Sequence, residues 1–154
     1  MNFFSDFNLS MIETKRGLIR YRKAGKGPGL LMLHGNPQTH LMWHKVAPKL
    51  AKEYTVICPD IPGYGKSFKP DIKENHEPYS KVNMASDIIN FMEMLGFAKF
   101  YILAHDRGAR IAHRLALDFS EKIIKLILLD IIPTIEHFER TNMEFAMGYY
   151  HWFW

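Results

Sequence analysis

The chain has 154 residues, which is enough for one domain and too short for two of ordinary size. Hydrophobic residues make up 47% of the sequence and charged residues 23%, which excludes collagen-like, low-complexity and strongly disordered chains. The net charge of +4 comes from basic residues scattered among acidic ones, so no nucleic-acid-binding surface is indicated.

Strand and helix patterns alternate along the chain. In chain order, the sequence predicts a strand at 18–22, a turn at 25–29, a strand at 30–33, a helix at 41–51, a strand at 54–59, a Pro/Gly segment and polar loop to about 78, a helix at 80–95, a strand at 100–104, a helix at 109–119, a strand at 123–129 and a helix at 136–150. Ser80 is a plausible N-cap of its helix, and Gly96 is its stop signal. This alternation favours an α/β fold with a mainly parallel sheet covered by helices on both faces.

Three predicted strand ends carry polar residues that could perform chemistry. They are the segment 34–37, the segment 105–108, and Asp130. Ligands of open α/β sheets bind beyond the carboxyl ends of the strands, so a site is expected where these segments meet.

Asp106 lies at a strand-to-helix junction with small residues two positions before and after it, Ala104 and Gly108. This is the spacing of a nucleophile elbow, in which a sharp turn exposes the nucleophile and leaves no room for larger neighbours. The alternative interpretation is that Asp106 only caps the helix that follows.

The turn His34-Gly35-Asn36-Pro37 directly follows an apolar strand. Its Asn36 N–H and the N–H of Arg107 could face a negative charge that develops during a reaction. The alternative is that Gly35 and Pro37 only shape a tight turn. Both patterns at successive strand ends are much less expected by chance than either alone.

With these motifs the chain resembles the α/β-hydrolase superfamily and, within it, the haloacetate (fluoroacetate) dehalogenases. The segments that carry the resemblance are 34–40, 59–67, 105–108 with Arg110, 129–134 and 150–152. The resemblance implies that Asp106 displaces the halide from the substrate and forms an ester that water then hydrolyses. It also implies that Arg107 and Arg110, one helical turn apart, bind the substrate carboxylate. Asp130 would orient the general-base histidine.

The resemblance further assigns His151 and Trp152 as a halide-binding pair from the cap region. Asn36 departs from the haloacetate group, where this position is usually aromatic, and His-Gly-Asn-Pro is typical of haloalkane dehalogenases. Those relatives and the epoxide hydrolases usually carry Trp after the nucleophile, so Arg107 favours an anionic substrate. Epoxide hydrolase and haloalkane dehalogenase stay alternatives, as does a catalytically inactive binding protein with the same fold.

The aromatic end of the chain suggests that the sequence has been cut inside a larger protein. Six of the ten residues from Phe145 to Trp154 are aromatic, whereas native termini are usually polar. We therefore expect residues 1–132 to be the N-terminal portion of the hydrolase core and residues 133–154 to begin a helical cap. The superfamily order of nucleophile, acid and histidine then places the base beyond Trp154, so that the chain alone would not turn over and would expose a sheet edge.

Other expectations concern cofactors, partners and location. Cys58 is the only cysteine, which excludes an internal disulfide, and its setting predicts a buried strand position. His40 and His44 are interpreted as helix-surface histidines rather than metal ligands, because no third ligand is evident. We expect no cofactor, no metal, a small halogenated carboxylate as substrate, no nucleic-acid or membrane partner, a homodimer when complete, and a cytoplasmic location.

Overall fold

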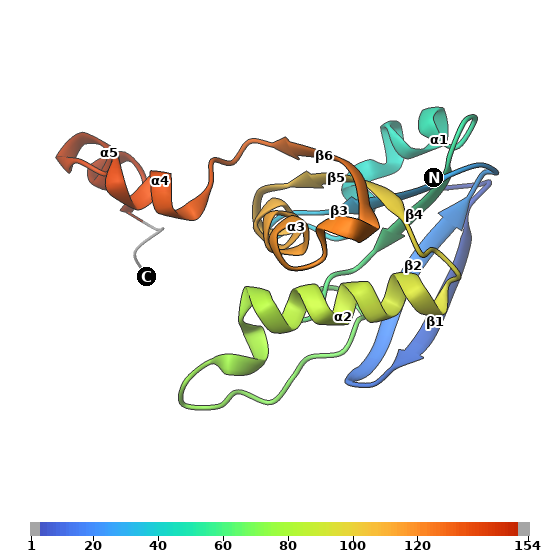
Figure 1. Cartoon of the computed structure of the whole chain (residues 1–154), viewed down its shortest axis with the longest axis horizontal. Helices are drawn as coiled ribbons and strands as arrows, with labels where there is room; N and C mark the ends of the chain where they lie inside the picture. Colours follow the sequence, from blue (N-terminus) through green and yellow to red (C-terminus); the bar gives the residue numbers. More distant parts are fainter. Residues whose placement is uncertain (1–3, 151–154) are drawn as a thin grey trace.

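The computed structural model describes residues 4–150 and contains one mixed sheet. Six strands lie in the order β1-β2-β4-β3-β5-β6 (Figure 1). The strands are β1 Asn8–Thr14, β2 Gly17–Ala24, β3 Gly29–Leu33, β4 Thr55–Pro59, β5 Phe100–His105 and β6 Ile123–Leu129. β4, β3, β5 and β6 run parallel, and β1 and β2 add an antiparallel hairpin at one edge. The predicted α/β class and its mostly parallel sheet are confirmed.

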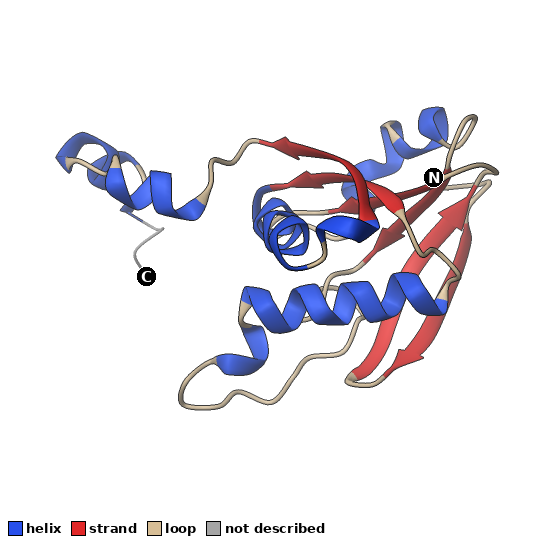
Figure 2. Ribbon diagram, in the orientation of Figure 1, coloured by secondary structure: helices blue, strands red, loops and turns tan. Residues whose placement is uncertain are grey.

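Helices cover both faces of this sheet (Figure 2). They are η1 His40–Lys45, α1 Ala47–Leu50, η2 Glu77–Tyr79, α2 Lys81–Met94, α3 Asp106–Asp118, η3 Ser120–Lys122, α4 Thr134–Glu139 and α5 Met143–Gly148. The pair α2 and α3 lies on one face of the sheet, and η1 with α1 lies on the other (Figure 1). None of the helices within residues 4–150 has the length and apolar character that crossing a membrane requires.

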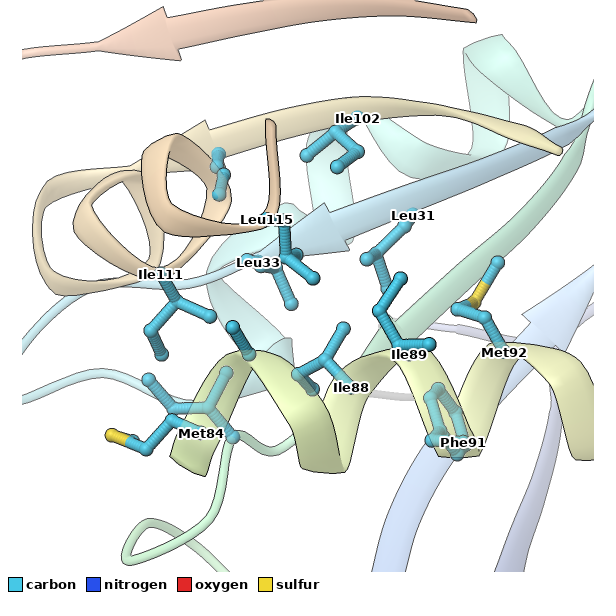
Figure 3. Packing of buried hydrophobic residues seen from close by; sticks show 14 of the residues in the cluster. Leu31, Leu33, Met84, Ile88, Ile89, Phe91, Met92, Ile102, Ile111 and Leu115 are labelled. Carbon is cyan, nitrogen blue, oxygen red and sulfur yellow. The ribbon is translucent and has the colours of Figure 1, made fainter. Parts of the chain in front are cut away.

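The strand β3 shows how the sequence specifies both layers. All five of its residues are buried, because successive side chains of a strand point to opposite faces and both faces are covered. Leu31 and Leu33 belong to the core beneath α2 and α3, as Figure 3 shows, whereas Leu30 and Met32 belong to the core beneath η1 and α1. The continuous apolar run is therefore a doubly covered strand, as the sequence predicts.

The second predicted helix is confirmed closely. α2 begins after Ser80, whose side chain accepts a hydrogen bond from the backbone N–H of Asn83, and it ends one residue before Gly96, at the C-cap Leu95. Met84, Ile88 and Phe91 recur at helical spacing and are buried. They point from α2 into the core (Figure 3), which is the amphipathic pattern that predicted the helix.

Two predicted helices differ from the observed ones, and one strand was not predicted. The helix predicted at 41–51 is a 3-10 helix followed by the short α1, whose first turn contains Pro48, a residue that cannot donate a backbone hydrogen bond to a preceding turn. The helix predicted at 136–150 is two short helices, and Asn142 caps the second by accepting from the N–H of Phe145. Finally, β1 was missed, although it pairs with β2 along its whole length.

The strand β6 forms the open edge of the sheet within the described residues. Ile124, Ile127 and Leu129 of β6 are 43%, 56% and 39% exposed. After β6, the short helices α4 and α5 extend away from the sheet (Figure 1). The expected exposed edge is thus present, and the division at residue 132 into core and cap stays a prediction.

Candidate active site

The three polar strand ends meet at one edge of the sheet. β3, β5 and β6 are consecutive neighbours in the sheet and run parallel, so their carboxyl ends lie together. Residues 34–36 follow β3, Asp106 follows β5, and Asp130 follows β6. The predicted meeting of these segments is confirmed.

Asp106 occupies a sharp turn between β5 and α3. The strand ends at His105 and the helix begins at the next residue, with no connecting loop. Asp106 has φ +47°, a left-handed conformation that is uncommon for residues with a side chain and that is found disproportionately at functional sites. A Cβ atom at Gly108 would lie 2.4 Å from the carbonyl oxygen of His34, so the turn leaves no room for a side chain there. This close approach explains the small residue that the elbow spacing requires.

The carboxylate of Asp106 is held by the turn that follows β3. The backbone N–H of Asn36 donates to Oδ1 of Asp106 over 2.8 Å. Among residues 4–150, no group donates a hydrogen bond to Oδ2. One carboxylate oxygen is therefore fixed while the other is left available for reaction.

The side chain of Asn36 is oriented by a residue that the sequence did not single out as functional. The hydroxyl of Tyr64 donates to Oδ1 of Asn36 over 3.1 Å. The amide oxygen is thereby engaged, so its NH₂ group is the donor that can serve a ligand. Burial raises the pKa of Tyr64, with Arg107 opposing and Asp106 adding to this shift, which keeps the hydroxyl protonated as a donor.

His34 performs a structural task at this turn. Its Nε2 accepts a hydrogen bond from the backbone N–H of Ile61 over 3.0 Å, so the ring proton lies on Nδ1, which donates to the carbonyl of Gly35. Burial lowers the pKa of His34, while the Gly35 carbonyl and Asp60 oppose this effect. The neutral ring ties the turn after β3 to the loop after β4, and it is Gly35 and Asn36 that approach Asp106.

Cationic side chains lie near Asp106 and interact with it electrostatically. Arg107 is exposed, and Arg110, one turn further along α3, donates to Oγ1 of Thr134 over 2.5 Å. Burial lowers the pKa of Arg110, and Arg107 lowers it further, whereas Asp106 acts in the opposite direction. Lys81 was not singled out in the sequence, and its pKa is affected by the charges of Arg107, Arg110 and Asp106.

Asp130 lies beside a histidine within the described structure. Its Oδ2 is 3.7 Å from Nε2 of His105, the residue immediately before Asp106. The Asp130 side chain is 89% exposed, and its backbone has φ +55°. The carboxylate thus borders the same edge of the sheet as Asp106, and its role as the catalytic acid stays a prediction.

A second polar cluster, formed by Asp60, His40 and Lys66, was not predicted from the sequence. Asp60 is fully buried. Its carboxylate accepts hydrogen bonds from the backbone N–H of His40 over 3.0 Å and from Nδ1 of the same residue over 2.7 Å. It also accepts from the backbone N–H of Lys66 over 3.1 Å. Burial alone would raise the pKa of Asp60, but these hydrogen bonds lower it to about 2. The interpretation of His40 as a helix-surface residue was wrong, because only 1% of it is exposed and it pairs with Asp60.

Two of the predicted site residues cannot be placed. His151 and Trp152, the expected halide-binding pair, lie outside the described residues 4–150. Within that range, no group of three or more His, Cys, Asp or Glu residues could hold a metal ion. Cys58 lies fully buried in β4 as predicted, and burial raises the pKa of its thiol.

Comparison with known proteins identifies relatives of this architecture. Residues 28–154 match the family model described as the alpha/beta hydrolase fold. The chain is 45% identical over 150 residues to a fluoroacetate dehalogenase of Burkholderia sp, which covers 97% of this chain and 49% of the relative. It is 37% identical over 115 residues to a soluble epoxide hydrolase of Corynebacterium sp. (strain C12), which covers 75% of this chain and 38% of the relative.

Solved structures share the same fold. A crystal structure from Nostoc sp PCC 7120, provisionally assigned as an alpha/beta hydrolase, superposes with a TM-score of 0.95 and 50% sequence identity, over 97% of this chain and 52% of that one. The chain spans about half the length of that structure and 49% of the dehalogenase relative. The family match, the sheet order and the turn at Asp106 agree, and the chain belongs to the alpha/beta hydrolase fold family.

Proposed function

We propose that the chain carries the nucleophile and the substrate-binding arginines of a haloacetate dehalogenase. Asp106 is the nucleophile, Arg107 and Arg110 bind the substrate carboxylate, and Asp130 is the acid that supports a histidine base. His151 and Trp152 are the proposed halide-binding pair, and residues 133–154 are proposed to begin the cap. The substrate is a small halogenated carboxylate.

The charge distribution around Asp106 is the observation that carries this proposal. Arg107, Arg110 and Lys81 all act electrostatically on one another or on Asp106, and Asp106 is the acidic residue among them. A neutral epoxide or haloalkane carries no negative charge to offset the positive charge of this cluster. A carboxylate substrate neutralises part of it through charge-assisted hydrogen bonds to the guanidinium groups.

The proposed reaction uses the two carboxylate oxygens of Asp106 differently, because Oδ1 accepts the hydrogen bond from Asn36 and Oδ2 accepts none among residues 4–150. Oδ2 attacks the halogen-bearing carbon, a carbon–oxygen bond forms, and the carbon–halogen bond breaks with its electron pair leaving on the halide. The Asn36 N–H holds Oδ1, which becomes the carbonyl oxygen of the resulting ester. A water molecule, losing a proton to a base, then attacks the ester carbonyl carbon, and the N–H faces the negative charge that develops on Oδ1. The bond from that carbon to Oδ2 breaks, the hydroxy acid leaves with Oδ2 and takes up a proton, and the Asp106 carboxylate is regenerated with an oxygen from water.

Hydrolysis of the ester requires a base that removes a proton from water. No histidine within residues 4–150 makes a hydrogen bond to Asp106, and His34 and His40 are committed to Ile61 and Asp60. We therefore expect the 154-residue chain to form the ester faster than it hydrolyses it. The intermediate should accumulate as one adduct per chain.

The experiment that tests this function is covalent labelling by chloroacetate at neutral pH. Intact-mass spectrometry should show the gain of one carboxymethyl group, and peptide mapping should locate it on Asp106. Asp106→Asn should abolish the adduct, whereas Asp118→Asn, at the far end of the same helix, should not. Chloroacetamide, the neutral analogue, should label Asp106 more slowly because it has no carboxylate for Arg107 and Arg110.

Epoxide hydrolysis is the competing function, since the Corynebacterium relative has 37% identity and the same attack by aspartate would open an epoxide. Styrene oxide provides the comparison. An Asp106 adduct that forms faster with styrene oxide than with chloroacetate would overturn the proposal. A non-catalytic protein would be favoured by two results together: neither reagent forms an adduct with the parent chain, and the Asp106→Asn chain retains a binding function.

A further inference from the structure

Lys81 occupies an unfavourable position for a lysine. It is the first residue of α2, directly after the N-cap Ser80, where the helix dipole places a partial positive charge. The first turn of α2 contains no acidic residue that would offset the lysine. A cation at this position opposes helix stability, so a role outside the helix would explain it.

Lys81 also lacks a partner of opposite charge among the described residues. Its Nζ lies 3.7 Å from Sδ of Met84, a thioether that accepts hydrogen bonds only weakly. No carboxylate within residues 4–150 lies at ion-pair distance from Nζ, although the side chain is half-buried. A partly desolvated ammonium group without an anion is costly, and an anionic ligand would offset that cost.

Two hollows border this lysine and connect it to the proposed site. One, of about 200 Å³, is lined by Tyr64, Tyr79, Lys81 and Arg107, among others. The second, of about 360 Å³, is lined by Lys81, Arg110 and Thr134, among others. Lys81 is the residue that lines both hollows, whereas Arg107 lines the smaller one and Arg110 the larger one.

The charges that face Lys81 come from α3. Burial lowers the pKa of Lys81, Arg107 and Arg110 lower it further, and Asp106 acts in the opposite direction. The helices α2 and α3 pack side by side on the same face of the sheet (Figure 1). Lys81 of α2 lines one hollow with Arg107 of α3 and the other with Arg110. Positive charges therefore outnumber the carboxylates around Lys81: Asp106 opposes its pKa shift, and Glu136 is the acidic residue that lines the larger hollow with Lys81, Arg110 and Arg114.

We propose that Lys81 is a third cationic ligand for the substrate carboxylate and a specificity-determining residue that selects anionic over neutral substrates. The identity of the anion rests on the proposed function, whereas the binding of a carboxylate at Lys81 does not. A small carboxylate in the hollow beside Tyr64 would receive hydrogen bonds from the Arg107 guanidinium and the Lys81 ammonium. Arg110 would complete the cluster from the other side.

Acetate, which lacks a leaving group, is the probe that tests binding apart from chemistry. The full chain in low-chloride buffer is titrated with acetate, and the dissociation constant is measured by NMR. Lys81→Met keeps the length of the side chain and removes its charge, and it should weaken acetate binding roughly tenfold. Lys81→Arg should restore binding to within a few-fold, because it returns the charge.

The controls separate a loss of binding from a loss of structure. Lys49→Met removes an exposed lysine from α1, on the opposite face of the sheet, and should leave acetate binding unchanged. If Lys81→Met does not fold, as judged by circular dichroism, Lys81→Gln replaces it in the same comparison. Acetamide should bind the chain far more weakly than acetate and should be insensitive to Lys81.

Failure of this inference and failure of the proposed function have different signatures. Absence of acetate binding to the parent chain, or unchanged binding in both the folded neutral variant and Lys81→Arg, overturns the role of Lys81. Acetate binding that depends on Lys81, in a chain that chloroacetate never labels at Asp106, supports the carboxylate site and overturns the dehalogenase.

Discussion

The backbone N–H of Asn36 donates a hydrogen bond of 2.8 Å to Oδ1 of Asp106, although 70 positions separate the two residues in the sequence. The contact joins the turn after β3 to the turn after β5. It fixes the carboxylate orientation and leaves Oδ2 without a donor among the described residues.

Gly108→Ala should destabilise the fold and displace the Asp106 turn. The added Cβ would lie 2.4 Å from the carbonyl oxygen of His34, which is backbone and cannot rotate away. We expect a loss of about 3 kcal/mol in the free energy of unfolding, measured by urea denaturation. Gly148→Ala is the matched control, because its Cβ would meet nothing within 4 Å, and it should be neutral or slightly stabilising. Equal stability of the two variants would contradict the tight turn.

Asp60→Asn should remove a contribution to stability that the parent chain has at neutral pH. The pKa of Asp60 falls from 3.8 to about 2 in the folded chain, so its stabilisation is fully present above about pH 4 and is lost as the pH falls through 2. This difference amounts to about 2 kcal/mol. The gap between the parent and variant unfolding free energies should therefore narrow on acidification. Asp71→Asn, an exposed loop change, should show no such trend.

Asp87 should make the free energy of unfolding depend on pH with the opposite sign. Burial raises its pKa from 3.8 to about 6, although the ion pair with Arg16 opposes this. A raised pKa gives stability that is present below pH 3.8 and is lost as the pH rises through 6. Relative to Asp87→Asn, the parent chain should lose about 3 kcal/mol over that window. Parallel stability curves for the two chains between pH 4 and 7 would argue against a raised pKa.

Tyr64→Phe should affect the site more than the fold. The variant deletes the hydroxyl that donates to the Asn36 amide oxygen, so the amide is free to rotate and its NH₂ group is no longer directed. We expect labelling of Asp106 by chloroacetate to slow by up to about tenfold, with a stability change near 1 kcal/mol. Tyr54→Phe, on the opposite face of the sheet, is the comparison, and its labelling rate should match that of the parent chain.

Ile127→Lys should reduce self-association of the chain. Ile127 is 56% exposed on the edge strand β6, beside an apolar hollow lined by Leu30, Leu103 and neighbouring side chains. Charged residues on an edge strand oppose pairing with another strand. Light scattering after size exclusion should show a smaller particle for this variant, whereas Ile72→Lys, in an exposed loop, should behave as the parent chain does.

The sequence predicted the parts of the fold that depend on local patterns. The buried runs at 30–33 and 100–104 are strands because apolar side chains cover both of their faces, and the spacing of Met84, Ile88 and Phe91 produces a helix. Local patterns failed where a partner elsewhere in the chain decided the outcome. β1 is a strand because β2 pairs with it, and its alternating residues carry too weak a pattern to indicate this alone.

The local sequence alone predicts a nucleophile elbow at Asp106, because a strand, the small residue Ala104, Asp106 and Gly108 follow one another within a few positions. The groups around Asp106 are brought there by contacts between distant parts of the chain. The ring of His34 accepts from the N–H of Ile61, and the carboxylate of Asp60 accepts from the ring of His40. Lys81 and Arg107 line the same hollow because α2 packs on α3. These contacts join residues far apart in the chain, and their geometry is set by sheet order and helix packing, which no local pattern encodes.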